Sequence, residues 1–200
     1  MMKRSRQREL LAEDWTVKFT DHVVARSRSS QRYYLRVGSR LEDLAIVQQW
    51  FQDVVHQFSH SLSEPIVWPQ NSFDRINLAI AEGFTNAVRH AHVDMPPDTP
   101  VIIECALQPQ RIEVRIFDQG EPFDPSKLAE PEPGTLREGG YGWFLIRRLV
   151  DEVTYSSARP KALAESAFSA KSVHPVDVDA MPSHSEIERV RNCLTLMKIV

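Results

Sequence analysis

Two polar side chains, Glu82 and Asn86, interrupt an otherwise apolar stretch of the 200-residue chain. Because they are four residues apart, an α-helix would project both side chains from one face, one turn from each other. The amide oxygen of Asn86 can ligate Mg²⁺ without adding charge, and Mg²⁺ usually completes its shell with water and substrate phosphates. Glu82 can orient or deprotonate a hydroxyl that attacks a phosphoryl group. On its own such a pair is more often a solvated helix face, so this hypothesis depends on the other motifs.

The residues around this pair predict one helix over about residues 73–92, followed by a Pro-rich segment that cannot continue it. Its apolar face, which we expect to pack on a sheet, contains Ile76, Ile80, Gly83, Phe84, Ala87 and Ala91. Arg89 and His90 fall on the polar face together with Glu82 and Asn86. The helix therefore offers four candidate side chains to one site.

A second candidate site follows the predicted strand 111–117, where Asp118 is separated by one residue from Gly120. Such a sequence is a turn in most proteins. A carboxylate at a strand end can also accept a hydrogen bond from an adenine amino group, and the glycine would let a flat ring approach the backbone.

Three glycines, Gly139, Gly140 and Gly142, precede a further predicted helix with a buried face. Free backbone N–H groups and the positive end of a helix attract anions, so this arrangement favours phosphate binding. The spacing excludes a dinucleotide fingerprint, which needs another glycine at position 145. It also excludes a P-loop, which needs Gly-Lys followed by Ser or Thr.

Apolar alternation and periodicity predict the elements that position these motifs. Strands are expected over residues 32–37, 101–107, 111–117, 152–156 and 192–200, and a helix over residues 41–58. Ser39 is expected to cap that helix. Residues 1–30 are polar and basic and are interpreted as a solvated tail, with contact to nucleic acid or acidic lipid as the less favoured alternative. Within the domain of residues 31–200, residues 157–190 lack apolar periodicity and predict a long surface insertion, with disorder as one interpretation.

The apolar fraction of 42% and the charged fraction of 26% are typical of a soluble globular protein. A net charge of −3 gives no general attraction to nucleic acid, and no apolar run approaches the roughly 20 residues of a membrane span. We therefore expect no direct nucleic-acid partner and no membrane. Because the start of the chain lacks an apolar export segment, a cytoplasmic location is expected. Cys105 and Cys193 fit no zinc spacing and are interpreted as small buried residues in a reducing compartment.

The motifs occur in a definite order, which is Glu82-x-x-x-Asn86-x-x-x-His90, then Asp118-x-Gly120, then Gly140-x-Gly142. This order resembles the GHKL ATP-binding family, which includes DNA gyrase, heat-shock chaperones, histidine kinases and mismatch-repair ATPases. Within that family the sequence is most similar to the small anti-sigma-factor serine/threonine kinases, over residues 32–156 and the last strand.

The resemblance implies an α+β two-layer sandwich with a mixed, mostly antiparallel sheet, helices on one face, and ATP with Mg²⁺ bound beneath a lid. It implies that Asn86 binds Mg²⁺, that Glu82 is the catalytic base and that Asp118 accepts the adenine amino group. The nucleotide-binding set carried over is Asn86, Arg89, His90, Asp118, Gly120, Phe123, Gly139, Gly140, Gly142 and Trp143.

Kinases of this family bind a sigma factor and phosphorylate a serine or threonine on its antagonist, so protein partners of these kinds are implied, and a homodimer is compatible with the resemblance. The alternative function is a nucleotide-dependent binding module that sequesters a partner without phosphoryl transfer. Glu82 favours the kinase, because binding alone does not require a base. A histidine-kinase ATP domain is disfavoured, since no phosphoacceptor helices precede the Asn86 helix.

Two features depart from the family. Residues 157–190 stand where the family usually has a short turn between its last two strands. The last strand also lacks an obvious threonine near Cys193, where one is expected to assist adenine binding. Both departures bear on the identity of the partner more than on ATP binding.

Overall fold

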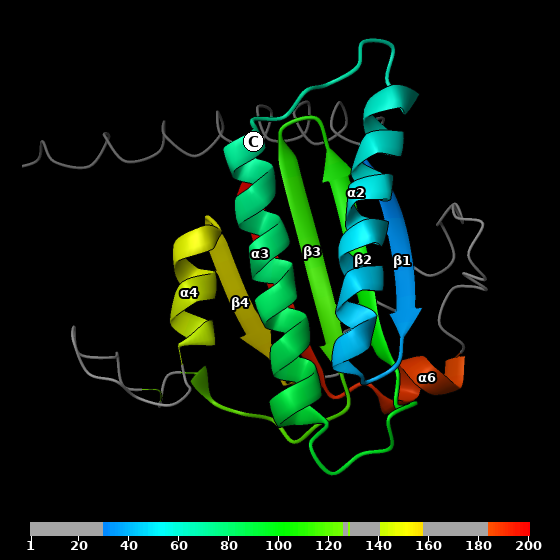
Figure 1. The fold of residues 1–200 in the computed structure, drawn as a ribbon, viewed down its shortest axis with the longest axis vertical. Helices are drawn as coiled ribbons and strands as arrows, with labels where there is room; N and C mark the ends of the chain where they lie inside the picture. The colour runs from blue at the N-terminus through cyan, green and yellow to red at the C-terminus, as the bar shows by residue number, and fades with distance from the viewer. Residues whose placement is uncertain (1–29, 126–127, 129–140, 158–183) are drawn as a thin grey trace, which may run out of the picture. The chain divides into compact units, whose positions relative to one another are not determined.

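The computed structural model describes residues 30–125, 128, 141–157 and 184–200 (Figure 1). In chain order the elements are β1 (Gln31–Val37), the 3₁₀ helix η2 (Leu41–Asp43), α2 (Leu44–Ser61), α3 (Gln70–Asn86), the π-helical turn η3 (Ala87–Ala91), β2 (Val101–Gln108), β3 (Arg111–Asp118), α4 (Gly142–Leu149), β4 (Glu152–Ser156), α6 (His184–Arg189) and β5 (Asn192–Ile199). All the predicted strands are present, with bounds that differ by at most one residue from those expected. In the described part of the chain, no helix has the length and apolarity needed to cross a bilayer.

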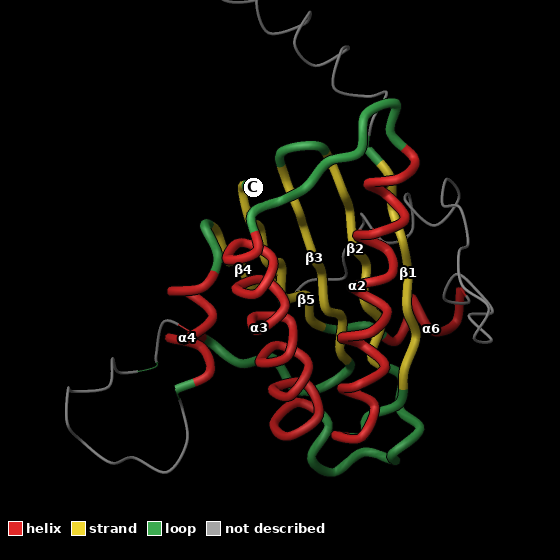
Figure 2. The backbone as a smooth tube through the Cα atoms, turned by 45° about the horizontal axis from the view of Figure 1, so that its top comes forward, coloured by secondary structure: helices red, strands yellow, loops and turns green. Residues whose placement is uncertain are grey.

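The strands form one sheet in the order β1-β2-β3-β5-β4, and each neighbouring pair is antiparallel. The helices α2, α3 and α4 cover one face of this sheet (Figures 1 and 2). This arrangement confirms the predicted α+β sandwich. The sheet was expected to be mixed, but the described strands contain only antiparallel pairs.

Residues along each strand alternate between two apolar clusters, because successive side chains of a strand point to opposite faces of the sheet. On β3, Ile116 belongs to the main core against the helices, whereas Phe117 belongs to a smaller cluster on the other face. The same alternation places Asp118, the last residue of β3, on the helical face. Its partner across the β3–β5 ladder is Asn192.

The closest approach of α3 to the sheet is at Gly83. A Cβ atom on this residue would lie 2.7 Å from Cδ1 of Ile116 and 2.9 Å from Cδ2 of Leu194. Real Cβ atoms are not found at such distances, so a larger residue at position 83 would require the ends of these two side chains to move. The glycine therefore lets Ile116 and Leu194 pack directly against the backbone of α3.

The second face of the sheet is partly covered by α6, which lies in the segment expected to be a surface insertion. Ile187 and Val190 pack there with the apolar residues Tyr34, Ile102, Phe117 and Cys193. Residues 184–190 are therefore part of the packed domain, which differs from the expectation that this segment adds no core. Residues 158–183 of the same segment lie outside the described residues.

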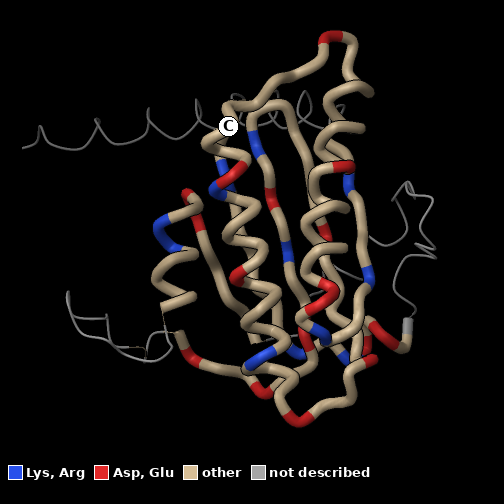
Figure 3. Tube along the Cα trace, viewed as in Figure 1, with Lys and Arg blue, Asp and Glu red and all other residues tan. Residues whose placement is uncertain are grey.

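Acidic and basic residues alternate along neighbouring strands of the sheet (Figure 3), and three of them pair on this second face. Glu104 on β2 is only 1% exposed, and its carboxylate pairs with Arg32 on β1 and Arg115 on β3. Burial raises the pKa of Glu104, while the two guanidinium groups oppose that shift. A buried carboxylate is tolerated at this position because cations flank it on both sides.

The packing of the α6 segment generates a test of stability. Val190 is 2% exposed, so Val190→Ala should lower the free energy of unfolding by about 1–2 kcal/mol, since the lost methyl groups leave a cavity against the sheet. The neighbouring exposed residue gives a matched control, Arg189→Ala, which should change stability little. Urea denaturation measures both variants. Equal stability of Val190→Ala and the parent would show that this segment does not contribute to the core.

Candidate functional site

The helix that carries Glu82 and Asn86 has a wider last turn than expected. It begins at Gln70, earlier than the expected Phe73, and its α-helical part ends at Asn86 itself. The following five residues form the π turn η3. Single π turns inside or after α-helices are rare and frequently lie at functional sites. Glu82 and Asn86 thus stand on the last regular turn, directly before the distortion.

The first residue of α4 lies directly against this pair. A Cβ atom on Gly142 would be 3.1 Å from Oε2 of Glu82 and 3.2 Å from Oδ1 of Asn86. The absence of a side chain at Gly142 therefore leaves both oxygens accessible from the start of α4. At the other end of α4, the guanidinium group of Arg75 donates hydrogen bonds to the carbonyl oxygens of Arg148 and Leu149, the latter at 3.2 Å. These bonds cap the last carbonyl groups of α4 and tie it to α3.

The other candidates on the helix face are placed differently. Arg89 and His90 lie in η3, and both side chains are exposed. Since a π turn holds more residues per turn than an α-helix, the face expected from α-helical geometry does not continue through it. Neither side chain makes a hydrogen bond or ion pair with another described residue. Gly139 and Gly140 lie outside the described residues.

Aromatic residues bring the Asp118 loop and α4 together. The rings of Phe123 and Trp143 meet edge to face, with centroids 5.9 Å apart, and Phe123 also contacts Tyr155 on β4 at 4.5 Å. The backbone N–H of Phe123 donates to the Tyr155 hydroxyl at 3.4 Å. Burial raises the pKa of Tyr155 to about 12, so this hydroxyl stays protonated. The predicted residues Phe123 and Trp143 therefore share one aromatic cluster.

Asp118 is buried, and one of its oxygens is held by two hydrogen bonds. Its Oδ1 accepts from the backbone N–H of Gly120 at 2.9 Å and from Nδ2 of Asn192 at 2.7 Å. The same Asn192 nitrogen donates to the carbonyl oxygen of Gly120 at 2.9 Å. Oδ2 accepts no hydrogen bond from the described residues. The carboxylate is thus fixed in orientation while one oxygen remains free to accept from a ligand.

Gly120 is required by a close backbone contact. A Cβ atom there would lie 2.3 Å from the carbonyl oxygen of Ala91, the last residue of η3. Any side chain would separate the Asp118 loop from the end of the helix. Gly120 thus allows the loop that follows Asp118 to pack directly on the end of η3.

Three further residues of the site were not predicted from the sequence. Asn192 occupies the strand where a threonine was expected, and its alternation with Leu194 and Leu196 was the available signal that it faces the helices. Tyr155 was assigned only to a strand. Ser39, expected to cap a helix, makes no cap; its hydroxyl lies 3.0 Å from Nδ1 of His92.

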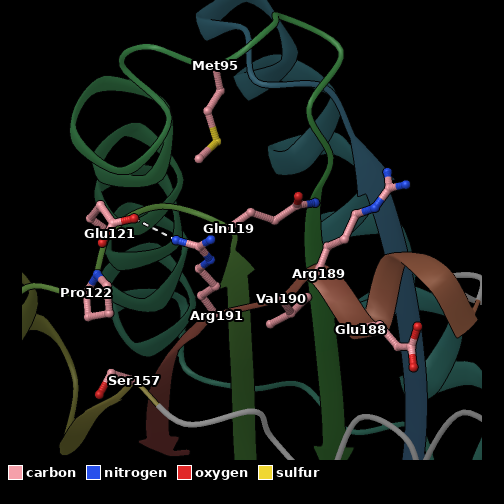
Figure 4. Close-up of a pocket in the computed structure, with 9 residues that line it drawn as sticks. All are labelled: Met95, Gln119, Glu121, Pro122, Ser157, Glu188, Arg189, Val190 and Arg191. Carbon is pink, nitrogen blue, oxygen red and sulfur yellow. Dashed lines mark hydrogen bonds and ion pairs between the residues drawn. The ribbon is translucent and has the colours of Figure 1, made fainter.

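A cavity of about 750 Å³ lies beside the loop that follows Asp118 (Figure 4). It is lined by that loop, by Met95, by the end of β4 and by the residues at the end of α6. Across it, Nη1 of Arg191 pairs with Oε1 of Glu121 at 2.6 Å (Figure 4). None of the predicted site residues lines this cavity, although Gln119 and Glu121 in its lining are next to Asp118 and Gly120 in the chain.

The fold and these motifs define an ATPase of the GHKL type. Residues 37–163 match the family described as the histidine kinase-like ATPase domain, and the chain belongs to this family. All the predicted site residues lie within the matched range.

Serine-protein kinases called RsbW are similar to this chain. The protein from Oceanobacillus iheyensis is 34% identical over 116 residues, which are 54% of this chain and 72% of that protein. The protein from Halalkalibacterium halodurans is 29% identical over 126 residues, or 59% and 76% of the two chains. The Staphylococcus epidermidis protein is 38% identical over 94 residues, or 42% and 59%. The resemblance to anti-sigma-factor kinases is thereby confirmed, and the chain is an ATP-binding protein.

The clamp on Asp118 generates a second prediction. Asn192→Leu removes a donor from the buried carboxylate, so the affinity for ATP should fall by roughly tenfold. Asn192→Thr restores a hydroxyl donor and should recover part of that loss. Thr195→Val, on the same strand but the opposite face, is the control and should bind as the parent does. Isothermal calorimetry with ATP compares the four proteins, and parental affinity in Asn192→Leu would remove Asn192 from the site.

Proposed function

We propose that the chain is an ATP-dependent serine/threonine protein kinase that acts as an anti-sigma-type, partner-switching regulator. In this function it transfers the γ-phosphate of ATP to a serine or threonine of an antagonist protein. The observation that carries the proposal is the contact of Gly142 with both Glu82 and Asn86. It joins a base and a metal-ligand candidate to the start of a helix that can approach phosphate.

Glu82 is the proposed general base. The hydroxyl oxygen of the protein substrate attacks the γ-phosphorus, its proton passes to the Glu82 carboxylate, and the bond from the γ-phosphorus to the bridging oxygen breaks to release ADP. Most of the barrier reduction in such a transfer comes from positioning and electrostatic stabilisation. The position of Gly142 relative to Glu82 and Asn86 is therefore proposed to be as important as the base itself.

Asn86 is the proposed Mg²⁺ ligand through its Oδ1 atom. The described residues contain no group of three His, Cys, Asp or Glu side chains that could hold a metal ion by themselves. Mg²⁺ at Asn86 would therefore take most of its shell from phosphate oxygens and water, as it commonly does. The ion would supply positive charge against the phosphates, so metal and nucleotide should bind together.

Asp118 is the proposed acceptor for the adenine amino group through its free Oδ2 atom. Phe123 and Trp143 would cover the nucleotide from the loop and from α4. Guanine presents a carbonyl oxygen where adenine presents the amino group, and a buried carboxylate should repel it. The site is therefore proposed to select ATP over GTP.

The proposed partners are a sigma factor and its antagonist, as the resemblance to the anti-sigma-factor kinases implies; the relatives themselves are named serine-protein kinases. The alternative remains a binding module that holds a partner in a nucleotide-dependent way without phosphoryl transfer. The contact between Gly142 and Glu82 favours the kinase, because a module that only binds gains nothing from a carboxylate at the phosphate end. Partner capture from cell extract with and without ATP, followed by detection of phosphoserine or phosphothreonine, separates the two functions.

The role of Glu82 is tested by the variant Glu82→Gln. The substrate in this assay is the unphosphorylated form of the partner that the capture experiment identifies. The rate of phosphoryl transfer should fall by about 10²-fold or more, while the affinity for ATP stays nearly the same. Asp74→Asn alters an exposed carboxylate on an earlier turn of α3 and should leave both quantities unchanged. An unaltered transfer rate in Glu82→Gln would favour the binding module.

The role of Asn86 is tested by Asn86→Ala with and without Mg²⁺. The parent should bind ATP more tightly when Mg²⁺ is present, and the variant should lose that gain because the neutral oxygen ligand is missing. Calorimetric titrations in chelator supply the control, since without metal the two proteins should bind ATP similarly. Tightening by Mg²⁺ that persists undiminished in the variant would exclude Asn86 as the ligand.

A further inference from the structure

His92 connects three segments that are distant in the sequence. It directly follows η3, and its side chain is 3% exposed. Its Nδ1 atom lies 3.0 Å from the hydroxyl oxygen of Ser39, which precedes η2 and α2. Its Nε2 atom lies 2.9 Å from the backbone nitrogen of Gln119, the residue after Asp118. The imidazole therefore bridges the segment before η2 and the loop that follows Asp118.

The hydrogen bonds define the protonation state of this imidazole. A backbone N–H can only donate, so Nε2 of His92 must accept the bond from Gln119 and carries no proton. In the neutral ring the proton is then on Nδ1, where it can be donated to the hydroxyl of Ser39. A protonated ring would place an N–H group against the N–H of Gln119. The observed geometry is compatible only with neutral His92.

We propose that His92 is a positioning residue for adenine recognition, which holds the Asp118 loop through the backbone of Gln119 and releases it when the imidazole is protonated. The inference rests on the proposed role of Asp118 as the adenine acceptor. The geometry that carries it is a pair of adjacent contacts: His92 bonds to Gln119, and Ala91 packs on the backbone of Gly120. Ala91 and His92, at the end of η3, thus hold Gln119 and Gly120, the two residues that follow Asp118.

The charged groups near His92 make the direction of its titration clear. Burial lowers the pKa of His92 from its ordinary value of 6.5, and the nearby carboxylate of Asp118 acts in the opposite direction. Asp43, whose Oδ2 lies near Gly38 beside Ser39, is a second acidic group on that side. Because the folded pKa is lowered, the contribution of the neutral ring is fully present above pH 6.5 and is lost as the pH falls through the lower, folded value.

The test compares the parent with two variants. In His92→Gln the side-chain oxygen can reach the position of Nε2 and accept from the Gln119 N–H, but it does not titrate in this range. In His92→Phe the ring shape is kept and the acceptor is lost. At about pH 8, His92→Phe should bind ATP roughly tenfold more weakly than the parent, because a buried N–H is left without a partner. His92→Gln should recover most of the affinity.

The dependence on pH gives the decisive readout. ATP affinity is measured by calorimetry at about pH 8 and then at successively lower pH, down to the lowest value at which the melting temperature shows that each protein is still folded. The phosphates of ATP titrate equally in every sample, so their effect cancels in the ratio of the parent to His92→Gln. That ratio should shift against the parent by about fivefold or more in acid.

Each outcome distinguishes this inference from the function on which it rests. If the parent does not bind ATP at either pH, the proposed nucleotide site is wrong and the inference falls with it. If the parent binds ATP and the parent-to-variant ratio does not change with pH, the positioning role alone is refuted. Parental affinity in a folded His92→Phe variant would refute it as well. Should His92→Phe fail to fold, the pH ratio for His92→Gln decides by itself.

Discussion

The arrangement of the site depends on how closely α3 packs on the sheet. At Gly83 the side chains of Ile116 on β3 and Leu194 on β5 pack so close to the helix backbone that an added methyl group would require them to move. On the same helix, Glu82 and Asn86 lie next to Gly142, and Ala91 at the end of η3 lies next to Gly120. Two more glycines are therefore needed at the points where the backbone of other segments meets the same helix. All three glycines lie where other segments pack closely on α3 and η3, and the tightest contact is that of Gly120 with the backbone of Ala91.

Two buried carboxylates in this fold are stabilised by different kinds of hydrogen-bond donor. Glu104 lies on the face opposite the helices, where its carboxylate forms ion pairs with the guanidinium groups of Arg32 and Arg115. Asp118 instead receives neutral donors, from the backbone of Gly120 and the amide of Asn192, and both act on the same oxygen. Neutral donors fix a carboxylate without neutralising it. In both carboxylates the donors act on one oxygen, since Oε2 of Glu104 is also without a hydrogen-bond partner, so the two differ in the charge of their donors.

The sequence predicted the parts of the fold that repeat and the parts of the site that form local motifs. The apolar run of β2 and the alternation in β3 placed those strands almost to the residue. The spacing of Glu82 and Asn86 was enough to place both on α3, one turn apart. The helix α6 was not predicted, because its short span offers only Ile187 and the following Val190 as apolar signals. The π turn was missed as well, since no residue type marks a change from α to π geometry.

The residues that hold Asp118 in place were harder to predict, because their contacts are between segments distant in the chain. The bond from His92 to Gln119 and the bond from Asn192 to Asp118 connect residues 27 and 74 positions apart. Asn192 follows directly on Val190 and Arg191, and the backbone N–H of Arg191 donates to the carbonyl oxygen of Asp118 at 2.9 Å. The segment that packs on the second face of the sheet is therefore continuous with the strand that orients the carboxylate on the first. Accordingly, the departure from the expected short turn and the departure from the expected threonine are adjacent in the structure, at the end of β3 where both faces of the sheet meet.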